Sequence, residues 1–155
     1  TDDLVTMEEY LRQFRARAEA VWDEQTVSPK FLPIDPSKPK SLGQCPPTSA
    51  VLLRQLRTRF PRKNFTLAIG QVRRDAEVII PLHVWVVEQA EHPQDNKVID
   101  ITADQSEVIE PVVYGSYGDV CNRGIHYVAY ETSHHGRFLH SEVQARAGIL
   151  RNRLT

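Results

Sequence analysis

Two apolar stretches decide the fold class: LHVWVV at residues 82–87 and KVIDIT at residues 97–102, separated by a polar connection that contains Pro93. Both stretches are rich in β-branched and aromatic residues, which is typical of β-strands. The short connection predicts that the two strands pair as an antiparallel hairpin. Three further stretches are predicted as strands on the same grounds: Phe65–Ile69, Glu77–Ile80 and Ile125–Tyr130.

Helices are predicted on both sides of these strands, because apolar residues recur there at three- and four-residue steps. The first helix covers residues 6–24. The second begins at Cys45, carries two prolines in its first turn and stops before Pro61. The last covers residues 141–154. Between the first two helices, residues 26–44 contain four prolines and are predicted to form an extended connector.

The length and composition predict one globular domain, since the chain has 155 residues of which 41% are hydrophobic and 25% charged. Helices near both ends and strands between them make this an α+β domain over residues 1–155. Within it, residues 45–140 are expected to supply the second helix and an antiparallel sheet.

Charge and hydropathy narrow the classes of partner. Lys and Arg number 19 against 20 Asp and Glu, and the resulting net charge of −1 disfavours nonspecific nucleic-acid binding. No apolar run approaches the length of a membrane span, and no basic-then-apolar signal segment opens the chain. Two cysteines are too few for a disulfide scaffold. We expect a cytoplasmic protein, or a secreted effector, with no nucleic-acid or membrane partner and no cofactor; oligomeric state is not predicted.

Cys45, His83 and Asp100 are the candidate catalytic residues. Cys45 lies at the predicted start of a helix, where the helix dipole stabilises a thiolate. Strand alternation puts His83 on the same face as Trp85. A hairpin centred between residues 91 and 92 would place His83 directly opposite Asp100. A thiol with a base and a carboxylate that orients the base is the arrangement needed for acyl transfer. A buried core thiol and a structural His–Asp pair are the alternatives.

Three short motifs add a resemblance: GQC at residues 43–45, HVW at residues 83–85 and IDITADQ at residues 99–105. Together they resemble the signature of small bacterial papain-like or transglutaminase-like proteins. The same order occurs in bacterial effector and toxin deamidases, which convert a glutamine of a target protein to glutamate. The resemblance implies a triad of Cys45 as nucleophile, His83 as base and Asp100 as orienting acid.

Two further residues, Gln44 and Trp85, are assigned roles at this site. Pro46 lacks the N–H that could have stabilised an oxyanion, so the backbone N–H of Cys45 and the side-chain amide of Gln44 are the expected donors. Trp85 is expected either to wall the site beside His83 or to belong to the core.

The predicted function is that of a cysteine-dependent amide hydrolase or acyltransferase that works through a thioester. Its substrate is expected to be an amide-containing protein, peptide or small molecule. Deamidation, peptide cleavage and transglutamination use the same residues and differ in the pocket and the acceptor. The first alternative is a catalytically silent papain-like binding module, and the second is a Cys/His metal-binding protein. A Cys45–Cys121 disulfide would also exclude the enzyme.

Two other groups of residues remain open. A Cys/His-rich stretch could bind a metal, although its spacing does not match a zinc site, or could simply lie at the surface. Its members are Cys121, His126, His134, His135 and His140. A basic run closes the second helix, and it is either a solvated helix face or a surface for an acidic protein or nucleic acid. That run consists of Arg54, Arg57, Arg59, Arg62 and Lys63.

Overall fold

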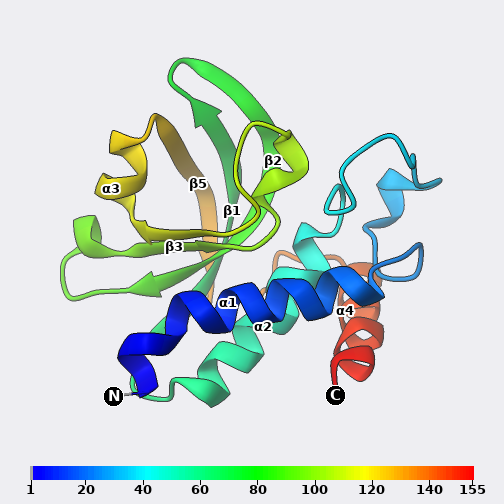
Figure 1. Ribbon diagram of the computed structural model, residues 1–155, viewed down its shortest axis with the longest axis horizontal. Coiled ribbons are helices and arrows are strands. Elements are labelled where there is room, and N and C mark those ends of the chain that lie inside the picture. Colours follow the sequence, from blue (N-terminus) through cyan, green and yellow to red (C-terminus); the bar gives the residue numbers. More distant parts are fainter. Residues whose placement is uncertain (1) are drawn as a thin grey trace.

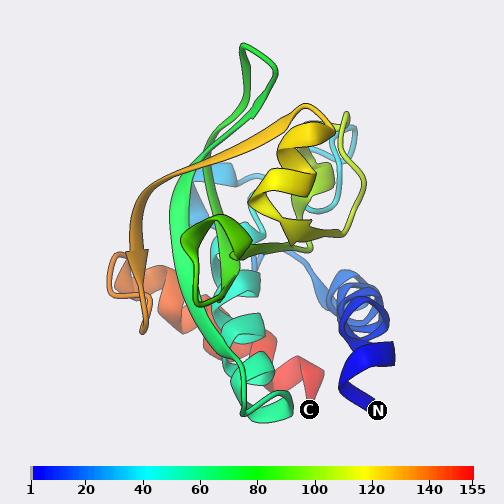
Figure 2. The ribbon, with the colours of Figure 1, turned by 90° about the vertical axis from the view of Figure 1, so that its left-hand side faces the viewer.

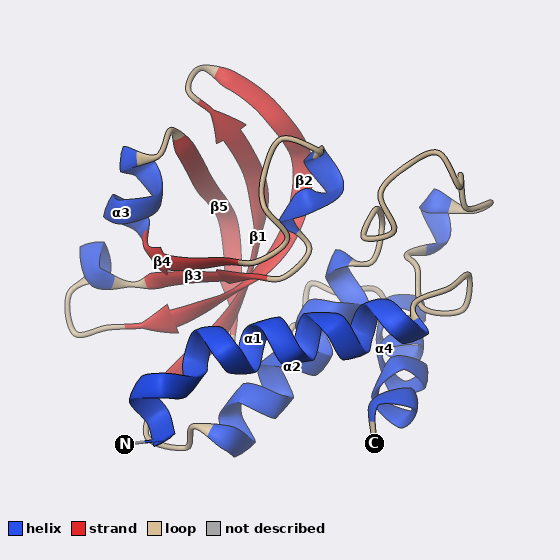
Figure 3. Cartoon of the chain, in the orientation of Figure 1, coloured by secondary structure: helices blue, strands red, loops and turns tan. Residues whose placement is uncertain are grey.

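The computed structural model describes residues 2–155, and the side chains from residue 7 onward. The elements follow in this order: α1 (Asp2–Val21), α2 (Cys45–Arg59), β1 (Asn64–Arg74), β2 (Glu77–Gln89), β3 (Lys97–Asp100), β4 (Val113–Ser116), α3 (Tyr117–Asn122), β5 (Ile125–Ser133) and α4 (Ser141–Leu154). The strands form one antiparallel five-stranded sheet in the order β4-β3-β2-β1-β5 (Figure 3). The expected α+β class is therefore confirmed.

Two apolar clusters hold the sheet between helices. On one face, α2 packs against β1 and β2, and α1 and α4 pack around α2 (Figure 1). Leu67, Val86 and Ile99 project from the sheet into this larger cluster. On the other face, Trp85 and Val98 belong to a smaller cluster that α3 covers. Alternate residues of β2 thus reach opposite cores, as the period of a strand requires.

The first helix differs from its expected range, because it begins at Asp2 and already ends at Val21. The chain leaves the helix in a turn at Asp23, whose carboxylate accepts a hydrogen bond from the Gln25 N–H at 2.8 Å. Asp commonly ends a helix in this way, because its short side chain competes for backbone donors. The last helix covers the expected residues 141–154.

The connector and the sheet also depart from expectation. Residues 26–44 fold into turns with one 3₁₀ segment, Pro29–Phe31, rather than an extended polyproline-like chain. Strand β2 runs continuously through Pro81, where two separate strands were expected. The ladder to β1 is irregular just there, and a proline that cannot donate fits such an irregularity. The hairpin formed by β1 and β2 projects beyond the other elements (Figure 2).

Strand β4 and helix α3 have no counterpart among the predicted elements. Both are short, four and six residues long, and they are stabilised by packing on the sheet rather than by any periodicity of their own. Such short elements form because of tertiary packing, so the sequence alone gives little basis for predicting them.

Candidate active site

The hairpin of β2 and β3 brings His83 and Asp100 together, although its register differs from the expected one. Val86 pairs with Ile99 and Glu88 with Lys97, so the turn is centred one residue later than expected. The pairing is thereby shifted by two residues, and His83 lies diagonal to Asp100 instead of opposite it. A two-residue shift keeps both side chains on the same face. The imidazole Nε2 of His83 consequently lies 2.7 Å from Oδ2 of Asp100.

Asp100 is buried and fully hydrogen-bonded. Besides His83, its Oδ2 accepts from the hydroxyl of Tyr127 at 2.7 Å. Its Oδ1 accepts from the backbone N–H of Thr102 at 3.0 Å and from the hydroxyl of the same residue at 3.2 Å. Burial by itself raises the pKa of Asp100, but His83 and these donors lower it below its ordinary value. The carboxylate therefore stays charged and fixed in orientation.

His83 is completely buried, and both Asp100 and Cys45 act on its ring. Burial lowers the pKa of His83, but Asp100 and Cys45 raise it more, through charge and hydrogen bonding, to about 10. The other ring nitrogen, Nδ1, lies 2.6 Å from the amide nitrogen of Gln105. That amide can donate only while Nδ1 is unprotonated, so Gln105 favours the neutral imidazole and opposes the effect of Asp100 and Cys45.

Trp85 does not line the site, so the second of its two expected roles is the observed one. Its indole is fully buried, stacks on the His83 ring at a centroid distance of 6.1 Å and donates from Nε1 to the hydroxyl of Tyr117 at 3.1 Å. Trp85 therefore belongs to the core and packs against the His83 ring from there.

Cys45 is the first residue of α2 and is only 5% exposed. Gly43 precedes it with φ +79°, a left-handed conformation, and a Cβ there would lie 2.7 Å from the Phe31 ring. The hydroxyl of Ser49, one turn into α2, donates to the Val84 carbonyl of β2 at 3.1 Å. These contacts fix the start of α2 against the strand that carries His83.

A cavity of about 450 Å³ opens at Cys45. Its walls are mostly apolar, and Ile69, Val84 and Val143 contribute to them, while Gln105 also reaches its lining. A cavity of this size and polarity accommodates a side chain or a small molecule.

Gln44 does not contribute to that cavity. Its side chain is buried, and its Oε1 accepts from the Thr26 hydroxyl at 2.9 Å while its Nε2 donates to the Asp23 carbonyl at 3.3 Å. The amide therefore anchors the connector and is not placed as an oxyanion donor, contrary to the expectation. Adjacency in sequence misled here, because the side chains of residues 44 and 45 leave the chain in different directions.

Tyr127, Thr102 and Gln105 are site residues to which sequence reasoning assigned no role. Thr102 and Gln105 lie in the IDITADQ motif, which was the available signal for them. Tyr127 comes from the edge strand β5, and no feature of the sequence connects it with Asp100.

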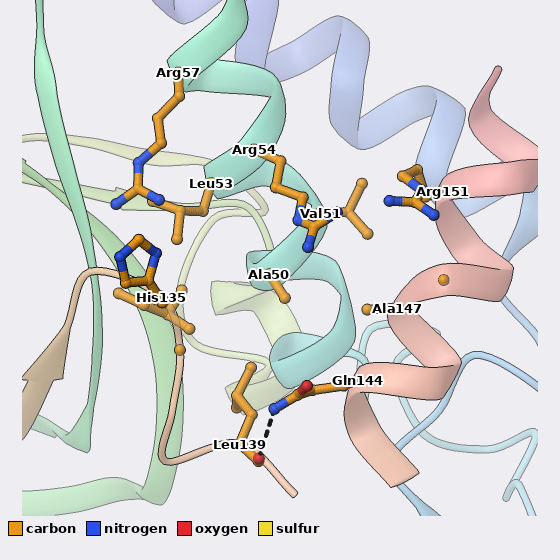
Figure 4. Close-up of a pocket in the computed structure, with 13 residues that line it drawn as sticks. Ala50, Val51, Leu53, Arg54, Arg57, His135, Leu139, Gln144, Ala147 and Arg151 are labelled. Carbon is orange, nitrogen blue, oxygen red and sulfur yellow. Dashed lines mark hydrogen bonds between the residues drawn. The ribbon is translucent and has the colours of Figure 1, made fainter. Parts of the chain in front are cut away.

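Cys121 and most of the remaining histidines lie elsewhere, but His140 lines the cavity at Cys45 and His135 lines a second cavity. Cys121 is exposed on α3, its Sγ is 3.2 Å from Nδ1 of His126, and neither cysteine forms a disulfide. Within the part of the chain that the structure describes, no group of three or more His, Cys, Asp or Glu residues is arranged to hold a metal ion. The basic run at the end of α2 contributes Arg54 and Arg57 to a second cavity, opposite Arg151 of α4 (Figure 4).

No protein-family model, curated protein or solved structure matches this chain. The resemblance to papain-like and transglutaminase-like proteins therefore stays a prediction. Among the described residues, no helix combines the length and apolar character needed to cross a membrane.

Proposed function

We propose that the protein is a cysteine-dependent amide hydrolase or acyltransferase with Cys45, His83 and Asp100 as its catalytic triad. The observation that carries the proposal is the fully buried His83, whose Nε2 lies 2.7 Å from Asp100 and whose pKa is raised by both Asp100 and Cys45. A buried imidazole between a fixed carboxylate and a thiol at a cavity is the arrangement that activates a sulfur nucleophile. The packing of α2 on β1 and β2 agrees with a papain-like or transglutaminase-like fold.

The triad supports an ordinary acyl-transfer sequence. His83 takes the proton of Cys45, and the thiolate attacks the amide carbonyl to form a carbon–sulfur bond. When the carbon–nitrogen bond breaks, His83 returns the proton to the leaving amine, and a thioester remains. Water or a second amine then attacks the thioester, again with His83 as base, and releases the thiol. Asp100 stays ionised throughout and stabilises the imidazolium.

Tyr127 and Thr102 keep the Asp100 carboxylate ionised and fixed in orientation. Burial and the adjacent carboxylate raise the pKa of Tyr127 well above its usual range, so its hydroxyl remains a donor. Three of the four hydrogen bonds to the carboxylate come from these two residues, which leaves the fourth position for His83 alone. Both are positioning residues, since neither is placed to touch a substrate.

The proposal is tested by trapping the acyl-enzyme. Para-nitrophenyl acetate is small enough for the cavity and needs no specific recognition. We expect a Cys121→Ser variant, in which Cys45 is the remaining cysteine, to release one nitrophenolate in a burst and to retain a hydroxylamine-labile acetyl group on Cys45. Adding His83→Ala should slow the burst by about a hundredfold or more. A burst that is absent, or is equally fast without His83, would reject the proposed function.

A further inference from the structure

Gln105 bridges the catalytic base and the turn that leads to the nucleophile. Its Nε2 lies 2.6 Å from Nδ1 of His83, and its Oε1 accepts from the backbone N–H of Gly43 at 3.4 Å. Its side chain is half-buried and lines the cavity at Cys45. The triad leaves this residue without a role.

The backbone beneath Gln105 is held firmly in place. Arg15 of α1 binds both carboxylate oxygens of the preceding residue, Asp104, at 2.7 and 2.9 Å. Arg15 also donates to the Ile101 carbonyl at 2.8 Å. Bidentate pairs of this kind fix position as well as charge. Because the loop is fixed, a change in the direction of the Gln105 amide would have to come from side-chain rotation.

The residues next to Cys45 in the chain supply one donor for the negative oxygen that forms when a thiolate attacks a carbonyl. The Cys45 N–H is available, because the first N–H groups of a helix have no acceptor within it. The next two residues, Pro46 and Pro47, have no N–H, and the Gln44 amide is held by the connector. The described side chains that line the cavity include the donors Ser28, Lys30, His140 and Gln105, and of these Gln105 is the one hydrogen-bonded to His83 and to the Gly43 N–H.

We propose that Gln105 is a further catalytic residue, whose Nε2 donates with the Cys45 N–H to the oxyanion of the tetrahedral intermediate. The inference rests on the proposed function. The amide donates to Nδ1 of His83 only while that nitrogen is unprotonated. When His83 holds the proton of Cys45, Nδ1 is itself a donor, so the two donors repel and the amide can turn toward the substrate oxygen, where charge develops.

Two reactions of Cys45 separate this role from a merely structural one. Acylation by para-nitrophenyl acetate passes through an oxyanion, whereas alkylation by iodoacetamide displaces iodide at a saturated carbon and forms none. Both rates are measured with Cys121→Ser as the background. We expect Gln105→Ala to lower the acylation rate by about a hundredfold and to change the alkylation rate by less than about threefold. Gln105→Met, which has about the same length but carries neither the amide donors nor a charge, should behave like Gln105→Ala.

Gln94→Ala is the matched control, because that glutamine is exposed on the turn between β2 and β3 and should leave both rates unchanged. Equal losses in both reactions would overturn the inference and make Gln105 a positioning residue for His83. Unchanged acylation would overturn it as well. A failure of the proposed function would give a different result. In that case His83→Ala, introduced with Gln105 unchanged, would leave the rates of both alkylation and acylation of Cys45 unaffected.

A second, independent inference comes from the cavity in Figure 4, which has a volume of about 300 Å³ and lies between α2, α4 and the loop before α4. Arg54, Arg57 and Arg151 line it, and no lining residue among those described is acidic. Of the described side chains, none forms a hydrogen bond or ion pair with the guanidinium of Arg54 or Arg151. Arg57 is oriented by the carbonyls of Phe65 and His134.

The three arginines line one cavity whose described lining holds no acidic residue, and burial lowers the pKa of Arg57, so its charged form is penalised. A bound anion would supply the missing counter-charge. Val51, Leu53 and Leu139 add apolar side chains to the lining. We infer that this cavity binds an organic phosphate, with the phosphate on the arginines and the carbon skeleton against these apolar side chains.

Phenyl phosphate is the probe, and calorimetry measures its binding. We expect saturable binding that Arg151→Gln weakens at least tenfold, while Arg62→Gln, an exposed arginine outside the cavity, has no effect. Inorganic phosphate and benzoate should each bind at least tenfold more weakly than phenyl phosphate, because inorganic phosphate lacks the apolar ring and benzoate lacks the phosphate group. No saturable binding, equal losses in the two variants, or equal affinity for the three probes would overturn the inference.

Discussion

Replacement of Tyr127 by phenylalanine removes one hydrogen bond from Asp100 and no carbon atoms. The hydroxyl donates to the buried carboxylate at 2.7 Å, and the residue is only 6% exposed, so water cannot replace it. A hydrogen bond to a buried charge contributes about 1.5–3 kcal/mol. For a chain of this length, a loss of about 2 kcal/mol lowers the melting temperature by roughly 4–8 °C.

The assay is urea unfolding of Tyr127→Phe beside Tyr130→Phe. The control deletes the same atom from the same strand, but Tyr130 is 60% exposed and its hydroxyl is solvated. The pKa of Asp100 is lowered from 3.8 in the folded protein, so its charge stabilises the fold above that pH and ceases to do so as the pH falls through the folded value. The difference between the variants should therefore shrink in acid. Equal free energies of unfolding for the two variants at neutral pH would refute the account of Asp100.

Three other predictions concern the surroundings of the site. Gln44→Ala should lower the free energy of unfolding by about 1–3 kcal/mol in a urea titration, because a buried amide network is lost, while the alkylation rate of Cys45 stays within about twofold. The pKa of His83 rises from 6.5 to about 10 on folding, so its contribution to stability is complete below pH 6.5 and is lost as the pH approaches 10; unfolding titrations should show a steeper alkaline loss for the native protein than for His83→Ala. Gly70→Ala would place a Cβ 2.0 Å from the Val128 carbonyl oxygen, and circular dichroism should show loss of the native fold or a melting temperature lowered by many degrees.

The sequence was sufficient for the pairing of His83 with Asp100, although the expected hairpin register was wrong. The part of the prediction that held is the face of the sheet on which each side chain lies, because a two-residue shift of the register leaves that face unchanged. The hydrophobic pattern determines the face, whereas the exact register depends on the turn. Here Asn96 accepts from the Ala90 N–H at 2.7 Å and helps to set the turn one residue further along.

The sequence could not reveal contacts made across the sheet or through a side-chain rotation. Tyr127 reaches Asp100 from an edge strand, across a separation of 27 residues. Gln44 adjoins the nucleophile in sequence and yet turns into the connector, while Gln105 lies 60 residues from Cys45 and reaches its cavity. Chain proximity carries little information at such positions, because the direction of each side chain is fixed by tertiary contacts.

The central claim is that His83 activates Cys45, and the rate of iodoacetamide alkylation against pH tests it most directly. The measurement compares Cys121→Ser with the double variant that also carries His83→Ala, over about pH 5 to 9. Ordinary thiols lose reactivity as the pH falls below about 8.5. We predict that Cys45 stays reactive well below that pH and that His83→Ala abolishes this reactivity. A slow rate that follows an ordinary thiol and does not depend on His83 would contradict the claim.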